Sequence, residues 1–136
     1  MKAVFADTLY WVAITSGEDA AHEDAISISR ALSPDQIITM DDVLCEYLAF
    51  FAGARRSVRI EAGNNVAELI ANPSVRVIPQ SRDSFLRGLE LYRARPDKGY
   101  SLVDCISMQT MRREGLTEVL TKDQHFEQEG FQALFR

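Results

Sequence analysis

Cysteine, glycine, proline and long apolar runs are all scarce in this 136-residue chain. Only two cysteines occur, Cys45 and Cys105, so the sequence lacks the disulfide framework of a small secreted protein. The longest uncharged apolar stretch, Tyr47 to Ala54, is far shorter than the roughly 20 residues that cross a membrane as a helix. These absences predict a cytoplasmic protein with reduced thiols and no membrane partner.

The seven glycines and four prolines are scattered, and no repeat, linker or low-complexity tract divides the chain. A chain of 136 residues suits one domain that buries its own core without disulfides or a structural metal. We therefore predict a single domain over residues 1–136.

Basic residues are the minority among the charges, with 15 Lys and Arg against 20 Asp and Glu and a net charge of −5. Proteins that hold nucleic acid by bulk charge alone are usually strongly basic, so the composition argues against that class. An enzyme acting on nucleic acid remains compatible, because an acidic cluster that binds a divalent cation contacts phosphate through the metal.

Short apolar runs alternate with amphipathic segments along the chain. We predict strands at residues 3–6, 37–40, 75–78, 119–121 and 131–135, and helices at 19–32, 41–51, 57–70, 81–95 and 102–113, with a short helix before the last strand. This alternation is typical of an α/β protein in which helices cover both faces of a parallel sheet. Right-handed crossovers then favour a doubly wound sheet, a three-layer α/β/α sandwich.

Acidic residues stand where the predicted strands end or where a following helix begins. They are Asp7, Glu46, Asp104 and Asp123. Because the carboxyl ends of parallel strands meet at one edge of the sheet, we expect the four carboxylates to converge there. Without a cation they would repel one another, and at least one would have to take up a proton. Oxygen ligands of this kind suit Mg²⁺ or Mn²⁺ and metal-assisted hydrolysis of a phosphodiester bond.

Each acid also has a purely structural interpretation. Asp7 can cap the helix that follows it, and Asp104 can form a capping box with Ser101. Asp123 can belong to a turn, and Glu46 can be a solvated helix residue. These alternatives stay open for each residue taken singly.

The four acids lie in four short motifs that follow one another along the chain. The motifs are Phe5-Ala6-Asp7-Thr8, Val43-Leu44-Cys45-Glu46, Tyr100-Ser101-Leu102-Val103-Asp104-Cys105 and Leu120-Thr121-Lys122-Asp123-Gln124-His125-Phe126. Their order and spacing resemble the PIN-domain ribonucleases, and most closely the VapC-type toxins of bacterial toxin–antitoxin modules. The resemblance implies a flavodoxin-like α/β/α sandwich, endonuclease action on RNA, a homodimer and inhibition by a cognate antitoxin. It also implies that Asp7, Glu46, Asp104 and Asp123 form the catalytic Mg²⁺ or Mn²⁺ site.

Two further features bear on partners and chemistry. Tyr47, Phe50 and Phe51 present more aromatic surface than one helix face needs, which we interpret as a homodimer contact. His125 lies two residues after Asp123, where a structural role and a role as general acid are both open, and we favour the structural one.

Basic residues gather in two sets that have three possible uses. The sets are Arg55, Arg56 and Arg59, and Arg87, Arg93, Arg95 and Lys98. They fit a solvated face, phosphate contacts around the acidic site, or salt bridges to an antitoxin.

Two functions stay open for the whole chain: a metal-dependent endoribonuclease, and a non-catalytic PIN-like module that binds RNA or protein. The four acids favour the enzyme.

Overall fold

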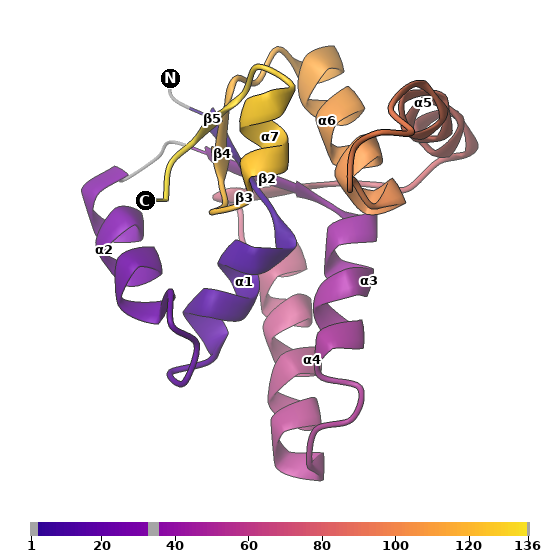
Figure 1. The fold of residues 1–136 in the computed structure, drawn as a ribbon. Coiled ribbons are helices and arrows are strands. Elements are labelled where there is room, and N and C mark those ends of the chain that lie inside the picture. The colour runs from indigo at the N-terminus through magenta and orange to yellow at the C-terminus, as the bar shows by residue number, and fades with distance from the viewer. Residues whose placement is uncertain (1–2, 33–35, 136) are drawn as a thin grey trace.

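The fold is organised around a parallel sheet. The computed structural model describes residues 3–32 and 36–135, and within them five strands pair in the order β3-β2-β1-β4-β5. The strands are β1 (Ala3–Ala6), β2 (Gln36–Met40), β3 (Val75–Ile78), β4 (Glu118–Leu120) and β5 (Gln132–Ala133). The helices are α1 (Thr8–Thr15), α2 (His22–Leu32), α3 (Asp41–Phe50), α4 (Arg56–Ala71), α5 (Arg82–Ala94), α6 (Leu102–Glu114) and α7 (Gln124–Gln128) (Figure 1).

Helices lie on both faces of this sheet. The connections through α1 to α4 lead from β1 to β2 and β3, whereas α5 to α7 lead back across the sheet to β4 and β5. Since parallel crossovers are right-handed, the reversal puts the two sets of helices on opposite faces. Figure 1 shows α1, α3 and α4 on one side of the strands and α5 and α6 on the other. The predicted three-layer α/β/α sandwich with a parallel sheet is confirmed.

The order in which strands are added reverses at β1: β2 and β3 lie on one side of it, and β4 and β5 lie on the other. The β1 and β4 side chains Val4, Phe5, Val119 and Leu120 are buried, as expected for strands covered on both faces. The register pairs Ala6 with Leu120, so the residues that follow them leave the sheet beside each other. Ligand sites of doubly wound sheets lie beyond the carboxyl ends of the strands at such a switch point.

The predicted elements agree with the structure to within one residue at most of their ends. One exception is the helix predicted from Asp19, which begins at His22. The Asp19 carboxylate accepts a hydrogen bond from the Ala21 backbone at 2.8 Å, and this holds the preceding residues in a turn. The last predicted strand shrinks to Gln132–Ala133 at the edge of the sheet.

Helix α6 lies in the core and has well-defined ends. At its start, the Ser101 hydroxyl accepts from the Asp104 backbone N–H, and the Asp104 carboxylate accepts from the Ser101 N–H, both at 3.0 Å. At its end, Gly115 adopts a left-handed conformation with φ of 70°, which a glycine takes without strain. The box fixes the position of the Asp104 backbone at the carboxyl edge of the sheet.

The proposed aromatic surface on α3 is wrong for two of its three residues. Tyr47 and Phe51 are buried, and the Tyr47 hydroxyl bonds the Thr15 hydroxyl at 2.8 Å. They are buried because α3 packs against α1 and α4, which cover two of its sides. Only Phe50 is exposed, with 63% of its surface accessible.

The structure also bears on the thiols and on membrane crossing. Both cysteines are free; Cys45 is exposed and Cys105 is buried. Among the described residues, no helix is both long enough and apolar enough to span a membrane.

Candidate active site

Four carboxylates meet at the carboxyl edge of the sheet. Asp7 follows β1, Glu46 lies in α3, Asp104 lies in the first turn of α6, and Asp123 precedes α7. All four line one cleft of about 460 Å³, together with Thr8, Leu9, Ala49 and Phe50. The fold therefore brings the four predicted acids into one cleft, and their roles stay predictions.

Asp7 is the most deeply buried of these acids, at 3% exposure. It occupies the N-cap position of α1, yet its side chain does not make the usual capping hydrogen bond to a backbone N–H two or three residues into that helix. Burial raises the pKa of Asp7 from 3.8 to about 7, and the charges of Asp104 and Glu46 act in the same direction. Hydrogen bonds from the Thr8 backbone and the Thr121 hydroxyl lower this pKa but are outweighed. The simple capping interpretation of Asp7 is therefore unsupported.

Two buried threonines lie beside Asp7: Thr8 lines the cleft, and Thr121 contacts the Asp7 carboxylate. The Thr121 hydroxyl donates to Asp7 Oδ2 at 3.0 Å and accepts from the Asp123 backbone N–H at 3.1 Å, so it links two of the acids. The Thr8 hydroxyl is buried and has no hydrogen-bond partner among the described residues. A buried hydroxyl without a hydrogen-bond partner costs about 1–3 kcal/mol of folding free energy, so this atom suits a polar ligand bound in the cleft.

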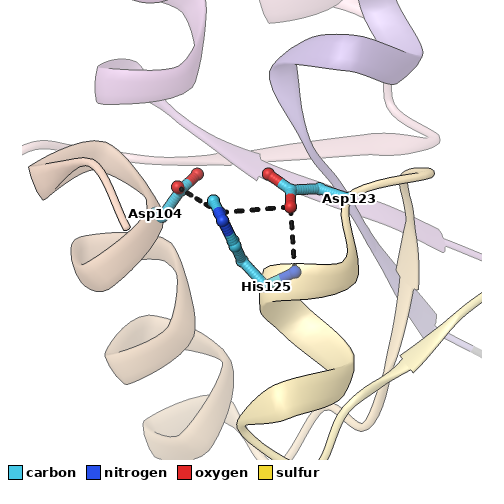
Figure 2. Close-up of side chains that lie close together, drawn as sticks. All are labelled: Asp104, Asp123 and His125. Atoms are coloured by element: carbon cyan, nitrogen blue, oxygen red, sulfur yellow. Dashed lines mark hydrogen bonds and ion pairs between the residues drawn. The ribbon is translucent and has the colours of Figure 1, made fainter. Parts of the chain in front are cut away.

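Asp104, Asp123 and His125 form the tightest group of side chains in the cleft region. His125 Nδ1 lies 3.4 Å from Asp104 Oδ2 and 3.2 Å from Asp123 Oδ1 (Figure 2). Burial raises the pKa of Asp104; the Ser101 backbone bond opposes this, and the charge of Asp123 adds to it. A divalent cation would favour the ionised form of Asp104.

Asp104 and Asp123 both have the structural roles expected for them, a capping box and a turn, and these roles do not exclude metal binding. Asp104 uses Oδ2 in its capping box with Ser101, and Asp123 uses Oδ1 to accept the His125 backbone N–H at 2.9 Å. Within the described residues, the second oxygen of each carboxylate makes no hydrogen bond, so both acids retain an oxygen for a ligand.

Glu46 reaches the cleft from the other side, on α3. It is half-buried, and it forms no hydrogen bond or ion pair with any other described residue. Its carboxylate is outside the group of three ligand atoms, from Asp104, Asp123 and His125, that lie within 4.8 Å of one another. Glu46 therefore contributes charge near Asp7, and no described partner occupies its carboxylate.

The donor atoms of the cleft fit a divalent cation. Several carboxylate oxygens face a small space, two of the acids have raised pKa values, and a buried hydroxyl lacks a partner. Oxygen-rich sites of this kind are typical of Mg²⁺ and Mn²⁺.

A buried ionic group lies behind His125 and has no local signature in the sequence. Glu129 accepts hydrogen bonds from Arg95 Nε and the Tyr100 hydroxyl, each at 2.9 Å, and from Arg112 Nη2 at 3.0 Å. These residues are 17 to 34 positions apart from Glu129, so no local pattern marks them. The second basic set is largely paired: Arg95 binds Glu129, Arg87 binds Asp83 and Lys98 contacts Asp97.

The first basic set differs from the second. Arg55, Arg56 and Arg59 are exposed, and none of them forms an ion pair within residues 3–32 and 36–135. They lie at the turn between α3 and the start of α4, at the end of the helical hairpin in Figure 1. Their charge is therefore available to an external partner.

A curated relative covers nearly the whole chain. The 23S rRNA-specific endonuclease VapC20 of Mycobacterium tuberculosis is 27% identical over 128 residues, which are 94% of this chain and 95% of that protein. The crystal structure of M. tuberculosis VapC20, described as a Sarcin-Ricin loop cleaving toxin, superposes with a TM-score of 0.85 at 25% identity. That match covers 98% of this chain and 99% of VapC20.

Two more distant structures share the fold. FitAcB from Neisseria gonorrhoeae has a TM-score of 0.71 at 14% identity, covering 98% of this chain and 96% of that one. VapBC2 from Rickettsia felis, bound to a DNA fragment from its promoter, has a TM-score of 0.70 at 12% identity, covering 96% of each chain. The family model of the PIN domain matches residues 4–131. A match of that extent, on a sheet and cleft of this arrangement, shows that the chain belongs to the PIN-domain family.

Proposed function

We propose that this chain is a metal-dependent endoribonuclease that hydrolyses RNA phosphodiester bonds and acts as the toxin of a toxin–antitoxin pair. The observation that carries the proposal is the cleft at the switch point of the sheet, where four carboxylates from distant parts of the chain meet. The similarity to VapC20 along nearly the whole chain supports RNA as the substrate class. Residues 1–136 are proposed to act as a single PIN domain.

The proposed metal ligands are Asp7, Glu46, Asp104 and Asp123. A bound Mg²⁺ or Mn²⁺ would supply charge neutralisation at the scissile phosphate and a water of lowered pKa. Asp104 and Asp123 each offer an unbonded carboxylate oxygen, and Glu46 supplies a further carboxylate from α3. Burial raises the pKa of Asp7 to about 7, so a nearby cation would favour its ionised form at neutral pH.

The remaining wall of the cleft suits a nucleotide. Thr121 fixes the orientation of the Asp7 carboxylate, and the unpaired Thr8 hydroxyl is available to orient a water or a phosphate oxygen. Leu9 and Phe50 line the cleft with largely exposed side chains. An acidic floor beside an apolar rim fits a ligand that combines a phosphate with an apolar ribose or base face.

The test is RNA cleavage by purified protein with Mn²⁺, with Mg²⁺ and with EDTA. Large-subunit ribosomal RNA is the first substrate to try, because VapC20 is named for cutting it. Asp7→Asn and Asp104→Asn should lose several powers of ten in activity, whereas Asp97→Asn, in an exposed turn, should keep it. Equal cleavage in EDTA, or near-full activity of Asp104→Asn, contradicts the mechanism. RNA binding without any cleavage in Mn²⁺ would instead favour the non-catalytic module.

The proposed partners are a cognate antitoxin and a second copy of the chain, in the cytoplasm. Exposed apolar side chains on α5, namely Phe85, Leu86 and Tyr92, together with Phe50 on α3, support a homodimer. Light scattering across a concentration series tests this. A monomer at high micromolar concentration, unchanged by Leu86→Glu or Phe50→Glu, contradicts the dimer.

A further inference from the structure

His125 is the one nitrogen donor in the group of three close ligand atoms with Asp104 and Asp123. Figure 2 shows its ring between the two carboxylates. Nδ1 lies 3.2 Å from Asp123 Oδ1 and 3.4 Å from Asp104 Oδ2, the oxygens that also accept backbone hydrogen bonds. A charge-assisted hydrogen bond is typically about 2.7–2.9 Å long, so neither contact is an optimised one. Adjacent ligand atoms about 2.1 Å from an octahedral ion are about 3.0 Å apart, which is close to the observed spacing.

We propose that His125 is itself a metal ligand through Nδ1, so that one divalent cation binds Asp104, Asp123 and His125 together. This inference rests on the proposed metal-dependent function and goes beyond its all-carboxylate ligand set. Imidazole nitrogen binds first-row transition ions in preference to Mg²⁺, whose favoured ligands are oxygens. The site therefore prefers Mn²⁺ to Mg²⁺.

The imidazole is held in place by the chain on both sides. The His125 backbone N–H donates to Asp123 Oδ1, so the spacing of the two residues is set by the start of α7. On the far side, a Cβ atom at Gly99 would lie 3.6 Å from His125 Nε2, which places that nitrogen against the Gly99 backbone. Nδ1 is then the nitrogen that faces the acids. The Tyr100 ring meets the imidazole edge to face, with centroids 5.2 Å apart.

Tyr100 is in turn fixed by a buried carboxylate. Its hydroxyl donates to Glu129, whose side chain is 5% exposed and is also bonded by Arg95 and Arg112. We call Tyr100, Arg95, Arg112 and Glu129 the Glu129 clamp. The clamp joins the end of α5, the start and body of α6 and the end of α7.

The clamp orients His125 before a metal ion arrives. Groups that hydrogen-bond the second nitrogen of a ligating histidine fix its ring, and their loss costs about 10–100-fold in metal affinity. Here the Tyr100 ring fixes the imidazole by packing instead. Tyr100 and Glu129 are thus positioning residues that act through His125. They contact neither the proposed metal nor the substrate.

The direct test uses pulsed electron paramagnetic resonance of bound Mn²⁺. The chain has only two histidines, and the other, His22, bonds the Ala13 carbonyl oxygen through its own Nδ1 at 2.6 Å. Protein labelled with ¹⁵N in histidine should show coupling of a directly bound ¹⁵N to Mn²⁺, and unlabelled protein should show ¹⁴N coupling instead. The coupling should persist in His22→Gln and vanish in His125→Gln. The labelled wild type gives an answer even if a variant fails to fold.

Calorimetric titration provides the second readout. His125→Gln should lose Mn²⁺ affinity about tenfold or more and Mg²⁺ affinity by a smaller factor. Tyr100→Leu, which removes the ring behind His125, should weaken Mn²⁺ binding more than Tyr100→Phe, which keeps it.

Three outcomes overturn the inference. The first is that Mn²⁺ binds the wild type but shows no nitrogen coupling. The second is that His125→Gln binds Mn²⁺ as tightly as the wild type. In both cases, metal-dependent RNA cleavage would leave the proposed function intact. No Mn²⁺ or Mg²⁺ binding at all would overturn the inference and the proposed function together.

Discussion

Replacing Asp7 by asparagine should stabilise the metal-free protein at alkaline pH. Asp7 is 3% exposed, and burial raises its pKa from 3.8 to about 7. Between these two values the folded chain binds more protons than the unfolded chain, so the free energy of unfolding falls as the pH rises. Above pH 7 the cost of ionising the buried carboxyl is complete. A difference of roughly 3 pKa units corresponds to about 4 kcal/mol.

Asparagine removes this cost because it stays neutral, and its amide oxygen can still accept the hydrogen bond from Thr121. In EDTA at about pH 8, Asp7→Asn should be more stable than wild type by up to about 4 kcal/mol, and the gap should close as the pH approaches 4. Excess Mn²⁺ should then narrow the advantage of Asp7→Asn. At a hundredfold excess over its dissociation constant, an ion stabilises the wild type by about 2.7 kcal/mol, whereas Asp7→Asn should gain much less.

Urea unfolding followed by circular dichroism at several pH values measures both effects. Asp97→Asn is the matched control, because it removes the same charge from an exposed turn. The reasoning is refuted if Asp7→Asn is less stable than wild type at pH 8 in EDTA. A stability gap that does not change with pH, or an equal gap in Asp97→Asn, would also refute it.

Three further expectations follow from other parts of the molecule. Glu129→Gln should lower the free energy of unfolding by up to about 3 kcal/mol at neutral pH, because hydrogen bonds from the arginine and tyrosine partners outweigh burial and lower the Glu129 pKa to about 2. This stabilisation of the wild type is present above about pH 4.5 and is lost as the pH falls toward 2. Acid titration of the unfolding of both proteins checks it. Asp104→Asn keeps an acceptor oxygen for its capping box, so in EDTA it should melt at or above the wild-type temperature and gain little from Mn²⁺. A loss of about 0.5–2 kcal/mol with no metal effect would leave Asp104 as a cap alone. Changing Arg55, Arg56 and Arg59 together to Gln should raise KM for RNA and flatten its salt dependence with kcat unchanged, and an unaltered KM with weaker antitoxin binding would assign them to the protein partner instead.

Local patterns were sufficient to predict the layers of the fold. Central parallel strands are buried on both faces, so they stand out as short apolar runs such as residues 3–6 and 37–40. Crossover handedness limits how such strands are ordered, and parallel strands end at one edge. For that reason the meeting of Asp7 and Asp123 in one cleft was predictable without any contact being known.

Patterns of exposure along single helices were less reliable. The apolar stripe of α3 did not reveal that Tyr47 and Phe51 face neighbouring helices whereas Phe50 faces solvent. The basic run before α6 did not reveal that Arg95 is committed to Glu129, 34 residues later. In each case the deciding neighbour comes from a different element, and its position depends on how the helices pack.

The sequence alone therefore determined which acids lie at the edge of the sheet, because strand ends are a local property and the parallel topology aligns them. Only the tertiary structure decided how those acids behave. Burial sets the raised pKa of Asp7, and the packing of Tyr100 on His125 aims an imidazole nitrogen between Asp104 and Asp123. Desolvation and ring orientation depend on every group that surrounds a side chain, and those groups converge only once the chain has folded.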